Sequence, residues 1–415
     1  MVLKMRKMKD SGIEWIGEIP EGWELTKVKR IFDIGRGRVI SQQELTSVGY
    51  PVYSSQTKNN GCLGYISTYD FDKSQLTWTT DGVNAGTVFL REGKYNCTNV
   101  CGTLAPKNDT NDLRYLKYAL EYIAFYHKRA DINGFKIMNN EMAEIELLLP
   151  PLFEQQNIAN YLDFKCSQTQ SILEQSLFSI EEYKKLKQAV ITQAVTKGVR
   201  GEREMKDSGV EWIGEIPKEW VCEKIKYATS ISRGLFNHRP RNDERYYNGK
   251  YPFIQTGDVA NATKYIVSYS QTLNELGKSV SKDFPKGTLT MTIAANVGDV
   301  AILNFDAYFP DSVVGFVPNK NIRTLYLFYV FSAMKDEFIR TAIKSTQLNL
   351  NIDRVKETFI PVTLNVNEQC EIENYLESKC AEIDGLIAKK EQLVKELESY
   401  KKSLIYEVVT GKREV

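Results

Sequence analysis

The chain has 415 residues, of which 42% are hydrophobic and 26% charged, and its formal net charge is +1 at pH 7. This composition is that of a folded globular protein with room for two to three domains, and it excludes an intrinsically disordered chain. The balanced charge also excludes a globally basic nucleic-acid binder of the histone kind, although a local basic face remains compatible with it.

The sequence lacks signals for a membrane or an oxidising compartment. No apolar run approaches the roughly 20 residues that span a bilayer, and residues 1 to 9 are too basic for a signal peptide, so we expect a cytoplasmic protein. The seven cysteines include no CxxC pair, which favours reduced, buried thiols over a disulfide framework. Cys97 and Cys101 are the one close pair, and packing explains them better than zinc binding does.

The chain begins with a segment that returns later almost unchanged. Residues 8 to 20 read MKDSGIEWIGEIP and residues 205 to 217 read MKDSGVEWIGEIP, and a tryptophan follows each at the same distance, Trp23 and Trp220. Repeats with a period near 200 residues indicate a duplicated domain rather than a solenoid. We therefore expect two half-molecules in series.

The first globular region, 21 to 150, combines short strands with one helix. The stretches 75 to 79, 87 to 90 and 100 to 104 are apolar or alternating and are separated by Asn, Asp and Gly, which is typical of strands and turns. Leu113, Leu116, Leu120 and Ile123 then recur at helical spacing, and Thr110 or Asn111 is the predicted N-cap.

The second globular region, 218 to 360, repeats this plan with divergent residues. We predict strands at 288 to 293 and 300 to 305 and a helix over about 322 to 343. Sparse landmarks link the two regions: residues 50 to 52 match 251 to 253, and 86 to 88 match 298 to 300. This region also holds an excess of basic residues, with 19 Lys and Arg against 14 Asp and Glu.

Each globular region is followed by proline and then by a long segment suited to a helix, because it has no further Pro and almost no Gly. Apolar residues recur there at spacings of three, four or seven, the pattern of a coiled coil. We predict that one such helix per half pairs in antiparallel fashion through the interface residues Leu162, Leu173, Ile180, Tyr183, Val190, Leu376, Ile383, Ile387, Val394, Leu397 and Leu404.

A search for catalytic motifs finds no phosphate-binding loop, no GxGxxG after a strand and no HExxH helix. The chain has only two histidines, His127 and His238, and this small number disfavours a histidine-based catalytic triad. Two rival hypotheses nevertheless stay open at this point: a self-sufficient DNA-modifying or DNA-cleaving enzyme with a duplicated domain, and a coiled-coil scaffold that binds only proteins.

The order of parts, EWIGEIP, variable region, PPLFEQQ, long helix and then all of it again, resembles the specificity (S) subunits of type I restriction–modification enzymes. The PPLFEQQ motif spans 150 to 156, and its second copy keeps one proline, Pro361, with three extra residues before Glu368-Gln369. The single proline and the extra residues bear on the local geometry of the second linker only. The resemblance covers essentially the whole chain.

The resemblance implies an α+β fold with two α/β target recognition domains in a pseudo-two-fold arrangement, separated by an antiparallel coiled coil of two conserved helices. The corresponding boundaries are 1–150 for recognition domain 1, 151–200 for spacer helix 1, 201–361 for recognition domain 2 and 362–415 for spacer helix 2. Each domain is expected to read one half of a bipartite asymmetric DNA site. The helices are expected to set the spacing and to dock modification subunits, two in number, with restriction subunits joining through the complex.

No catalytic residue, metal site or cofactor is expected on this chain, since the family implies that S-adenosylmethionine, ATP and Mg²⁺ belong to the partner subunits. Phosphates are contacted mainly by Lys and Arg, and base edges by Arg, Lys, Asn and Gln. Loops rich in these residues supply the candidate DNA contacts: Arg36, Arg38, Lys58, Asn59, Asn60 and Lys136 in the first domain, and Arg233, Asn237, Arg239, Arg241, Lys264, Lys344 and Gln347 in the second. For any single one of them, a solvated loop residue is the simpler interpretation.

Overall fold

The computed structural model describes residues 6–132, 134–341, 343–344 and 348–415, although the side chains of 341–349 are not part of that description. The chain divides into two compact units. Unit 1 comprises Met1–Leu177 with Glu391–Val415, and unit 2 comprises Phe178–Lys390. Each unit therefore takes one globular region, the adjacent part of its own long helix and a part of the other long helix.

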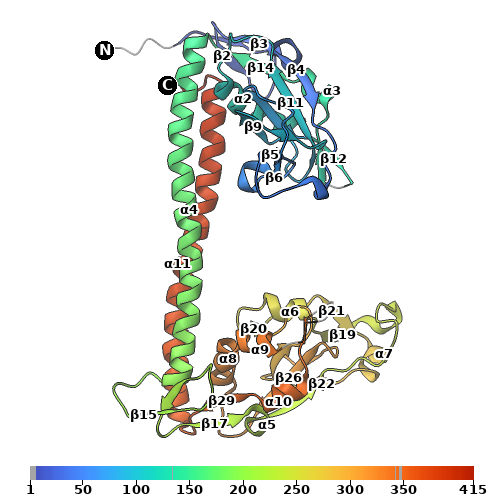
Figure 1. Cartoon of the computed structure of the whole chain (residues 1–415). Coiled ribbons are helices and arrows are strands. Elements are labelled where there is room, and N and C mark those ends of the chain that lie inside the picture. The colour runs from blue at the N-terminus through green and yellow to red at the C-terminus, as the bar shows by residue number, and fades with distance from the viewer. Residues whose placement is uncertain (1–5, 133, 342, 345–347) are drawn as a thin grey trace. The chain divides into compact units, whose positions relative to one another are not determined.

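Unit 1 is built on a sheet of four antiparallel strands in the order β4-β11-β7-β9, against which α2 packs (Figure 1). Two three-stranded sheets, β10-β5-β6 and β12-β13-β8, and the pairs β1-β2 and β3-β14 complete it. Its elements are β1 (Met8–Asp10), β2 (Glu18–Pro20), β3 (Glu24–Lys27), α1 (Val28–Ile31), β4 (Phe32–Arg36), η1 (Gln42–Glu44), β5 (Tyr50–Tyr53), η2 (Lys58–Gly61), β6 (Cys62–Ile66), β7 (Gln75–Thr79), β8 (Asp81–Gly82), β9 (Val88–Arg91), β10 (Asn96–Cys97), β11 (Cys101–Pro106), α2 (Leu113–His127), β12 (Arg129–Asp131), β13 (Gly134–Lys136), α3 (Asn139–Glu144) and β14 (Glu146–Leu149).

Unit 2 has a five-stranded sheet in the order β18-β26-β23-β24-β20 and a four-stranded sheet in the order β21-β19-β25-β22. The pairs β15-β16, β17-β29 and β27-β28 lie outside these sheets. Its elements are β15 (Met205–Asp207), β16 (Glu215–Pro217), β17 (Val221–Lys224), α5 (Ile225–Ala228), β18 (Thr229–Arg233), η3 (Glu244–Tyr246), β19 (Tyr247–Phe253), α6 (Thr256–Asn261), β20 (Tyr265–Ile266), β21 (Gln271–Leu273), α7 (Glu275–Ser279), β22 (Asp283–Phe284), β23 (Leu289–Thr292), β24 (Val300–Leu303), β25 (Ala307–Tyr308), β26 (Val313–Pro318), α8 (Thr324–Ala333), α9 (Lys335–Thr341), β27 (Ile343–Lys344), β28 (Leu348–Asn349), α10 (Ile352–Glu357) and β29 (Phe359–Val362).

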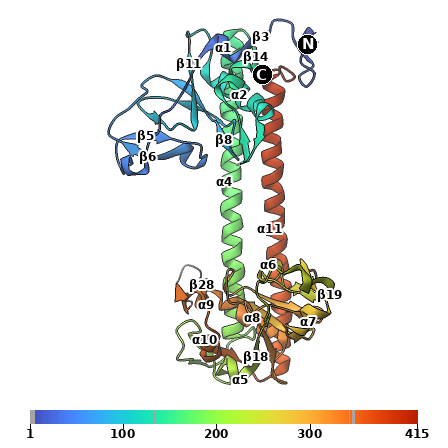
Figure 2. The ribbon, with the colours of Figure 1, turned by 90° about the vertical axis from the view of Figure 1, so that its right-hand side faces the viewer.

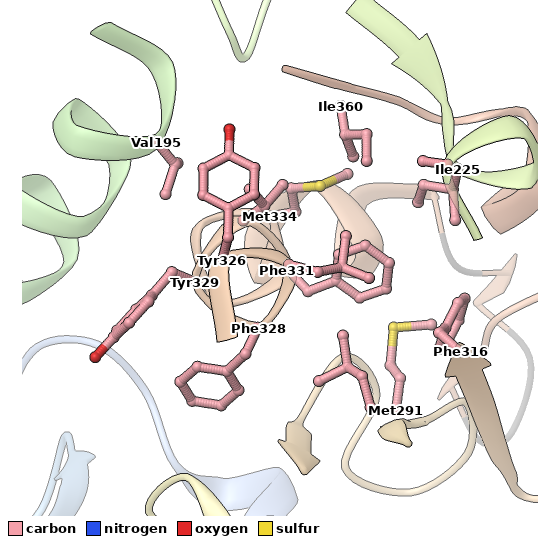
Figure 3. Close-up of a cluster of buried hydrophobic side chains, with 14 of the residues drawn as sticks. Val195, Ile225, Met291, Phe316, Tyr326, Phe328, Tyr329, Phe331, Met334 and Ile360 are labelled. Carbon is pink, nitrogen blue, oxygen red and sulfur yellow. The ribbon is translucent and has the colours of Figure 1, made fainter. Parts of the chain in front are cut away.

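The main core of unit 2 lies between its sheet, α8 and the end of α4 (Leu152–Lys197). Figure 3 shows Tyr326 and Phe331 of α8 packed among side chains from other elements, including Phe316 of the sheet and Val195 of α4. The Phe316 and Phe331 rings meet edge to face, with centroids 5.0 Å apart. The core of unit 1 is organised in the same way around Trp78, which is fully buried, and α2.

Two local predictions were wrong. The N-cap of α2 is Asp112 rather than Thr110 or Asn111, because its carboxylate accepts hydrogen bonds from the backbone N–H groups of Arg114 and Tyr115 at 2.8 and 3.2 Å. The side chain of Asn111 is instead engaged by the Gln155 amide of α4, a tertiary contact that local sequence does not reveal.

The predicted helix over 322 to 343 is two helices, α8 and α9, separated at Met334. Met334 has φ −92° and ψ 4°, and its N–H donates to Phe331 at 3.1 Å, which tightens the last turn of α8. Every residue from Tyr326 to Phe331 is buried, so the sequence has no polar face whose interruption would mark the break.

The long helices are α4, with 46 residues, and α11 (Val366–Val409), with 44. In place of the proline pair that precedes α4, the second linker uses Asn365, whose side chain accepts hydrogen bonds from the N–H groups of Asn367 and Glu368. The extra residues of the second copy therefore supply a different helix start. Both helices are followed by a glycine with positive φ, Gly198 at 74° and Gly411 at 72°.

Within each unit, segments of α4 and α11 lie side by side and run antiparallel (Figures 1 and 2). In unit 1, Lys401 Nζ donates to Gln170 Oε1 at 3.5 Å. In unit 2, Lys187 pairs with Asp384 at 2.7 Å and, further along, Arg200 pairs with Glu371 at 2.7 Å. Among the predicted interface residues, the buried ones are Leu162, Leu173, Ile180, Leu376, Ile383 and Leu404, and the half-buried ones are Tyr183, Val190, Ile387, Val394 and Leu397.

Candidate nucleic-acid interface

Asp81 lies at the centre of the first group of candidate DNA contacts. Arg36, at the end of β4, has Nη2 3.7 Å from Asp81 Oδ2, and Lys136 of β13 has Nζ 3.2 Å from Asp81 Oδ1. Asp131 of the same hairpin also pairs with Lys136, at 3.1 Å, and both partners raise the pKa of the lysine. Residues far apart in sequence thus form one cluster of ion pairs, in which carboxylates hold the cationic side chains in place.

Arg38 lies just beyond this cluster and has its own acidic partners. Its Nε is 3.0 Å from Asp70 Oδ2, and its Nη1 is 3.4 Å from Glu44 Oε2. A DNA phosphate would have to compete with these carboxylates for the guanidinium, which is a cost that the sequence alone does not show.

The η2 turn holds three of the candidate residues of unit 1. Lys58, Asn59 and Asn60 are exposed, and their side chains make no hydrogen bond or ion pair with any residue that the structure describes. Asn59 and Asn60 have φ of 49° and 53°, and Gly61 has 80°, so three consecutive residues adopt the left-handed region. Asn and Gly are the residue types that tolerate this conformation best.

In unit 2 the corresponding role of a central carboxylate belongs to Asp311. It pairs with Arg241 and with Nη2 of Arg239, the latter at 3.5 Å. The backbone carbonyl of the same residue accepts a hydrogen bond of 2.6 Å from Nε of Arg233. Arg233, Arg239 and Arg241 therefore all contact one acidic residue from a distant part of the chain.

Arg36 and Arg233 occupy equivalent positions in the two units. Each ends the edge strand of the main sheet, β4 or β18, and each donates Nε to a backbone carbonyl just before the neighbouring strand, Asn99 O or Asp311 O. Gly37 and Gly234 follow them, and a Cβ at either glycine would lie 2.2 Å from a backbone oxygen. The framework around this arginine is thus shared, while its neighbours differ between the units.

The remaining candidates in unit 2 have different surroundings. Asn237 is exposed beside the Arg239 turn. Lys264 forms an ion pair with Glu377 of α11, and this contact favours a structural role for the lysine over DNA binding. Lys344 belongs to β27, but its side chain lies outside the described part of the structure, and Gln347 lies outside the described residues altogether.

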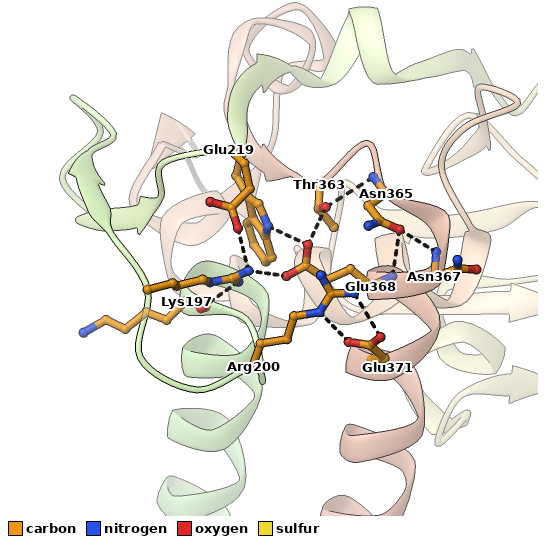
Figure 4. Close-up of polar contacts among 10 residues, drawn as sticks. Lys197, Arg200, Glu219, Thr363, Asn365, Asn367, Glu368 and Glu371 are labelled. Atoms are coloured by element: carbon orange, nitrogen blue, oxygen red, sulfur yellow. Dashed lines mark hydrogen bonds and ion pairs between the residues drawn. The ribbon is translucent and has the colours of Figure 1, made fainter.

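A set of anchoring contacts joins each globular region to the first turn of its helix. In unit 2, Glu368 of α11 is 1% exposed and accepts from Trp220 at 3.1 Å, from Thr363 at 3.0 Å and from Arg203 at 2.6 Å. Figure 4 shows Glu368 in this network, with Glu219 and Lys197 nearby. The neighbouring Gln369 accepts from the backbone N–H of Arg323 at 2.8 Å, which ties the start of α8 to the same turn.

Unit 1 repeats these anchoring contacts. Glu154 accepts from Trp23 at 3.1 Å and pairs with Arg6 at 2.5 Å, and Gln155 accepts from the N–H of Asp112 at 2.9 Å. The repeated Trp and Glu-Gln are visible in the sequence, but the sequence does not show that they contact each other. Their recurrence at matched positions in both halves is the signal that could pair them.

The described residues contain no group of three or more His, Cys, Asp and Glu side chains able to hold a metal ion. In the same residues, no helix combines the length and the apolar character that crossing a bilayer requires. Asp81 and Asp311 are the functional candidates that the sequence missed, because their role depends on cations from distant elements.

The family described as "Type I restriction modification DNA specificity domain" matches this chain twice, over residues 20–182 and 231–396. The putative type I specificity subunit S.MpnORF507P of Mycoplasma pneumoniae is 28% identical over 343 residues, which cover 81% of this chain and 84% of that protein. The specificity subunit of the type I restriction enzyme MpnII from the same organism is 33% identical over 214 residues, covering 51% of this chain and 57% of that protein.

A solved chain from work on complex assembly and conformational transition of the type I R-M system matches with a TM-score of 0.72 at 13% identity. The match covers 95% of this chain and 99% of that chain, and it shows a common fold. The two family matches coincide with the two repeats and extend over most of the sequence. The chain therefore belongs to the type I restriction–modification specificity family and is the DNA specificity subunit, the non-catalytic part, of such a system.

Proposed function

We propose that each globular region reads one half of a bipartite, asymmetric DNA site. The observation that carries the proposal is the pair Arg36 and Arg233: one framework position in two units, with different polar neighbours. Asp81 and Lys136 lie beside the first arginine. The second arginine donates to the backbone carbonyl of Asp311, whose carboxylate pairs with Arg239 and Arg241. Two domains with one fold and different contact surfaces are suited to two different short sequences.

The acidic residues have a definite part in this proposal. In the free protein they hold long cationic side chains in place, which reduces the conformational entropy lost when DNA binds. They also weaken binding to an arbitrary duplex, because each phosphate contact must replace an existing ion pair. Tight binding then depends on base contacts in addition to charge.

The subunit is part of a type I restriction–modification complex and assembles with other subunits, and the cofactors of the reaction reside on those modification and restriction subunits. We propose that it docks two modification subunits, one on each long helix, and that restriction subunits join through them. Exposed apolar side chains support this: Ile172 and Leu186 on α4 are 44% and 49% exposed, and Leu386 and Tyr400 at the equivalent places of α11 are 37% and 45% exposed.

These apolar side chains form a stripe on each helix. At about 100° per residue, Ile172 and Leu186 lie about 110° around α4 from buried Leu173 and Ile180, and Phe164 and Phe178 lie about 80° further round, on the side away from the buried residues. A long helix that exposes apolar residues on a second face is typical of a helix that packs against a partner. The repetition on α11 supports a stoichiometry of two.

We further propose that the helices set the gap between the two half-sites. With 46 residues, α4 is about 70 Å long. Seven residues add about 10 Å to a helix, which is about three base pairs of duplex. Inserting one heptad into α4 and one into the facing segment of α11 should lengthen the unspecified gap of the recognition site by about three base pairs and leave both half-site sequences unchanged. An unchanged gap would contradict the spacing role.

Sequencing of methylated bases in cells that express this chain with its modification subunit tests the main proposal. We expect methylation at a motif with two specified parts separated by a gap of unspecified bases. Substituting Arg36 and Lys136 should alter one part only, and substituting Arg239 and Arg241 should alter the other part only. A single uninterrupted motif, or a change in both parts from either pair of substitutions, would overturn it.

A further inference from the structure

A buried arginine lies beneath the η2 turn of unit 1. Arg91, the last residue of β9, is 1% exposed. Its guanidinium carbon lies 3.5 Å from the centroid of the Tyr53 ring and 4.2 Å from that of Phe89. Nε donates to Thr77 Oγ1 at 3.1 Å, and Nη1 donates to the backbone carbonyl of Asn60 at 2.7 Å.

The charge of this side chain is not compensated locally. Within the residues that the structure describes, no carboxylate lies within ion-pair distance of Arg91, and its Nη2 is buried without a hydrogen-bond partner. Burial lowers the pKa of the guanidinium, but arginine stays protonated in proteins. A buried, unpaired charge is costly, so its presence calls for a reason beyond packing.

The fold itself does not require arginine at this position. Residues 86 to 88 match 298 to 300, so the equivalent of Arg91 is Leu303, three residues after Val300. Leu303 is also 1% exposed and packs in an apolar cluster with Ile254 and Phe309. Unit 2 thus fills the same strand position with an ordinary hydrophobic residue.

The segment above the two positions differs in the same way. In unit 2, the residues after the matched Tyr-Pro strand form a regular helix, α6. In unit 1 they form the η2 turn, whose Asn59, Asn60 and Gly61 all have positive φ. The carbonyl of Asn60 accepts from Arg91, and a Cβ at Gly61 would lie 2.9 Å from Nη2 of the same arginine. Arginine therefore accompanies the irregular turn, and leucine accompanies the helix.

We propose that Arg91 is a positioning residue for the η2 turn and that the turn reads base pairs of the half-site assigned to unit 1. The guanidinium fixes the strained backbone, so that the free side chains of Lys58, Asn59 and Asn60 project in a defined arrangement. Its charge also adds positive potential under a segment that faces the phosphate backbone. This inference rests on the proposed function, because it assumes that unit 1 reads one half-site.

The test uses Arg91→Leu, which installs the residue of unit 2, in the full-length chain assembled with its modification subunit. Binding is measured to duplexes that carry the recognition site found by methylation sequencing and to duplexes with single base-pair changes. We expect Arg91→Leu to lose at least tenfold discrimination at one or two base pairs of one half-site and none at the other. The triple variant Lys58→Ala, Asn59→Ala, Asn60→Ala should lose discrimination at the same base pairs.

Two further variants guard against misfolding and misassignment. Gly61→Ala strains the turn from its other side and keeps the buried charge, so it should affect the same base pairs as the triple variant, and this comparison remains available if Arg91→Leu is poorly folded. Leu303→Val, at the matched position of unit 2, should leave that half-site unchanged. If folded Arg91→Leu keeps full discrimination, or loses it at base pairs that the triple variant does not affect, the positioning role is wrong. A wild-type complex that recognises no bipartite site would instead refute the proposed function.

Discussion

The indole Nε1 of Trp220 donates a hydrogen bond of 3.1 Å to Oε2 of Glu368, which lies 148 residues further along the chain. The same bond, of the same length, joins Trp23 to Glu154 in the other unit. In both cases the tryptophan follows the repeated EWIGEIP segment and the glutamate lies in the first turn of a long helix. The tryptophan after each repeated segment therefore anchors its globular region to the first turn of the long helix.

Removing the buried carboxylate should destabilise unit 2. Glu368→Ala leaves Arg203, Thr363 and Trp220 without their common acceptor in a site where Glu368 is 1% exposed. Loss of one partner from a buried ion pair typically costs about 3 to 5 kcal/mol. We expect a loss of about 3 kcal/mol in the unfolding free energy of unit 2, measured by urea denaturation.

Glu371→Ala is the matched control, because it removes an exposed carboxylate in the next turn of the same helix, one that pairs with Arg200. Exposed ion pairs contribute about 0 to 1 kcal/mol. Equal effects of the two substitutions would show that the Trp220–Glu368 contact is not an important anchor.

The ion pairs of Asp311 predict opposite effects of two substitutions on DNA binding. Replacing Arg239 and Arg241 by alanine should weaken binding to one half-site and reduce the salt slope of the affinity by about 1 for each lost phosphate contact. Asp311→Asn should strengthen binding at low salt, because the two guanidinium groups no longer need to leave a carboxylate. Titrations of the complex at several salt concentrations measure both effects.

Arg245→Ala serves as the control for this experiment, since Arg245 is exposed, lies close by in sequence and pairs with Asp243 instead. It should leave affinity and salt slope unchanged. Weaker binding by Asp311→Asn would argue that the carboxylate itself supports the DNA contact surface.

The exposed stripes on the long helices predict a stepwise loss of partner subunits. Ile172→Asp and Leu386→Asp should each leave a complex with one modification subunit, and the double variant should bind none. Native mass spectrometry gives the stoichiometry, and circular dichroism verifies that the helices persist. Glu174→Ala, an exposed polar position on α4, should keep both subunits. Full assembly by the double variant would place the docking surface elsewhere.

Two equivalent glutamates predict part of the acid sensitivity. The Lys27 and Lys29 side chains bond Glu144 at 2.7 and 2.5 Å and lower its pKa to about 2, and Lys224 and Lys226 do the same to Glu357. Between the ordinary glutamate value of 4.5 and about 2, the unfolded chain binds more protons than the folded one. The stability that these pairs contribute is therefore complete above pH 4.5 and is lost as the pH falls through this window.

Glu144→Gln with Glu357→Gln removes both titrating groups. We expect a smaller dependence of the unfolding free energy on pH between 4.5 and 2 than in the wild type, with the two curves parallel above pH 5. Urea denaturation across this range measures the slopes. Identical slopes below pH 4.5 would mean that the lysine pairs do not persist in solution.

The sequence by itself determined the duplication, the strands at β7 and β23 and the existence of the long helices. Repeated sequence segments, apolar periodicity and the absence of proline can all be read directly from the order of residues. The sequence did not show the break at Met334, and it placed the N-cap of α2 at Thr110 or Asn111 instead of Asp112. The uniformly buried α8 has no alternation of polar and apolar residues that would mark its end. The Asn111 side chain accepts a hydrogen bond from Gln155 of the distant helix α4.

Only the tertiary structure decided the electrostatics of the candidate interface. The proposed role of Asp81 and Asp311 depends on their ion pairs with Arg36, Lys136 and Arg241, which come from other elements. The burial of Arg91 likewise depends on Tyr53 and on a turn 31 residues earlier in the chain. Charge pairing and burial act through space at a few ångströms, and the linear order of residues does not fix which side chains come that close.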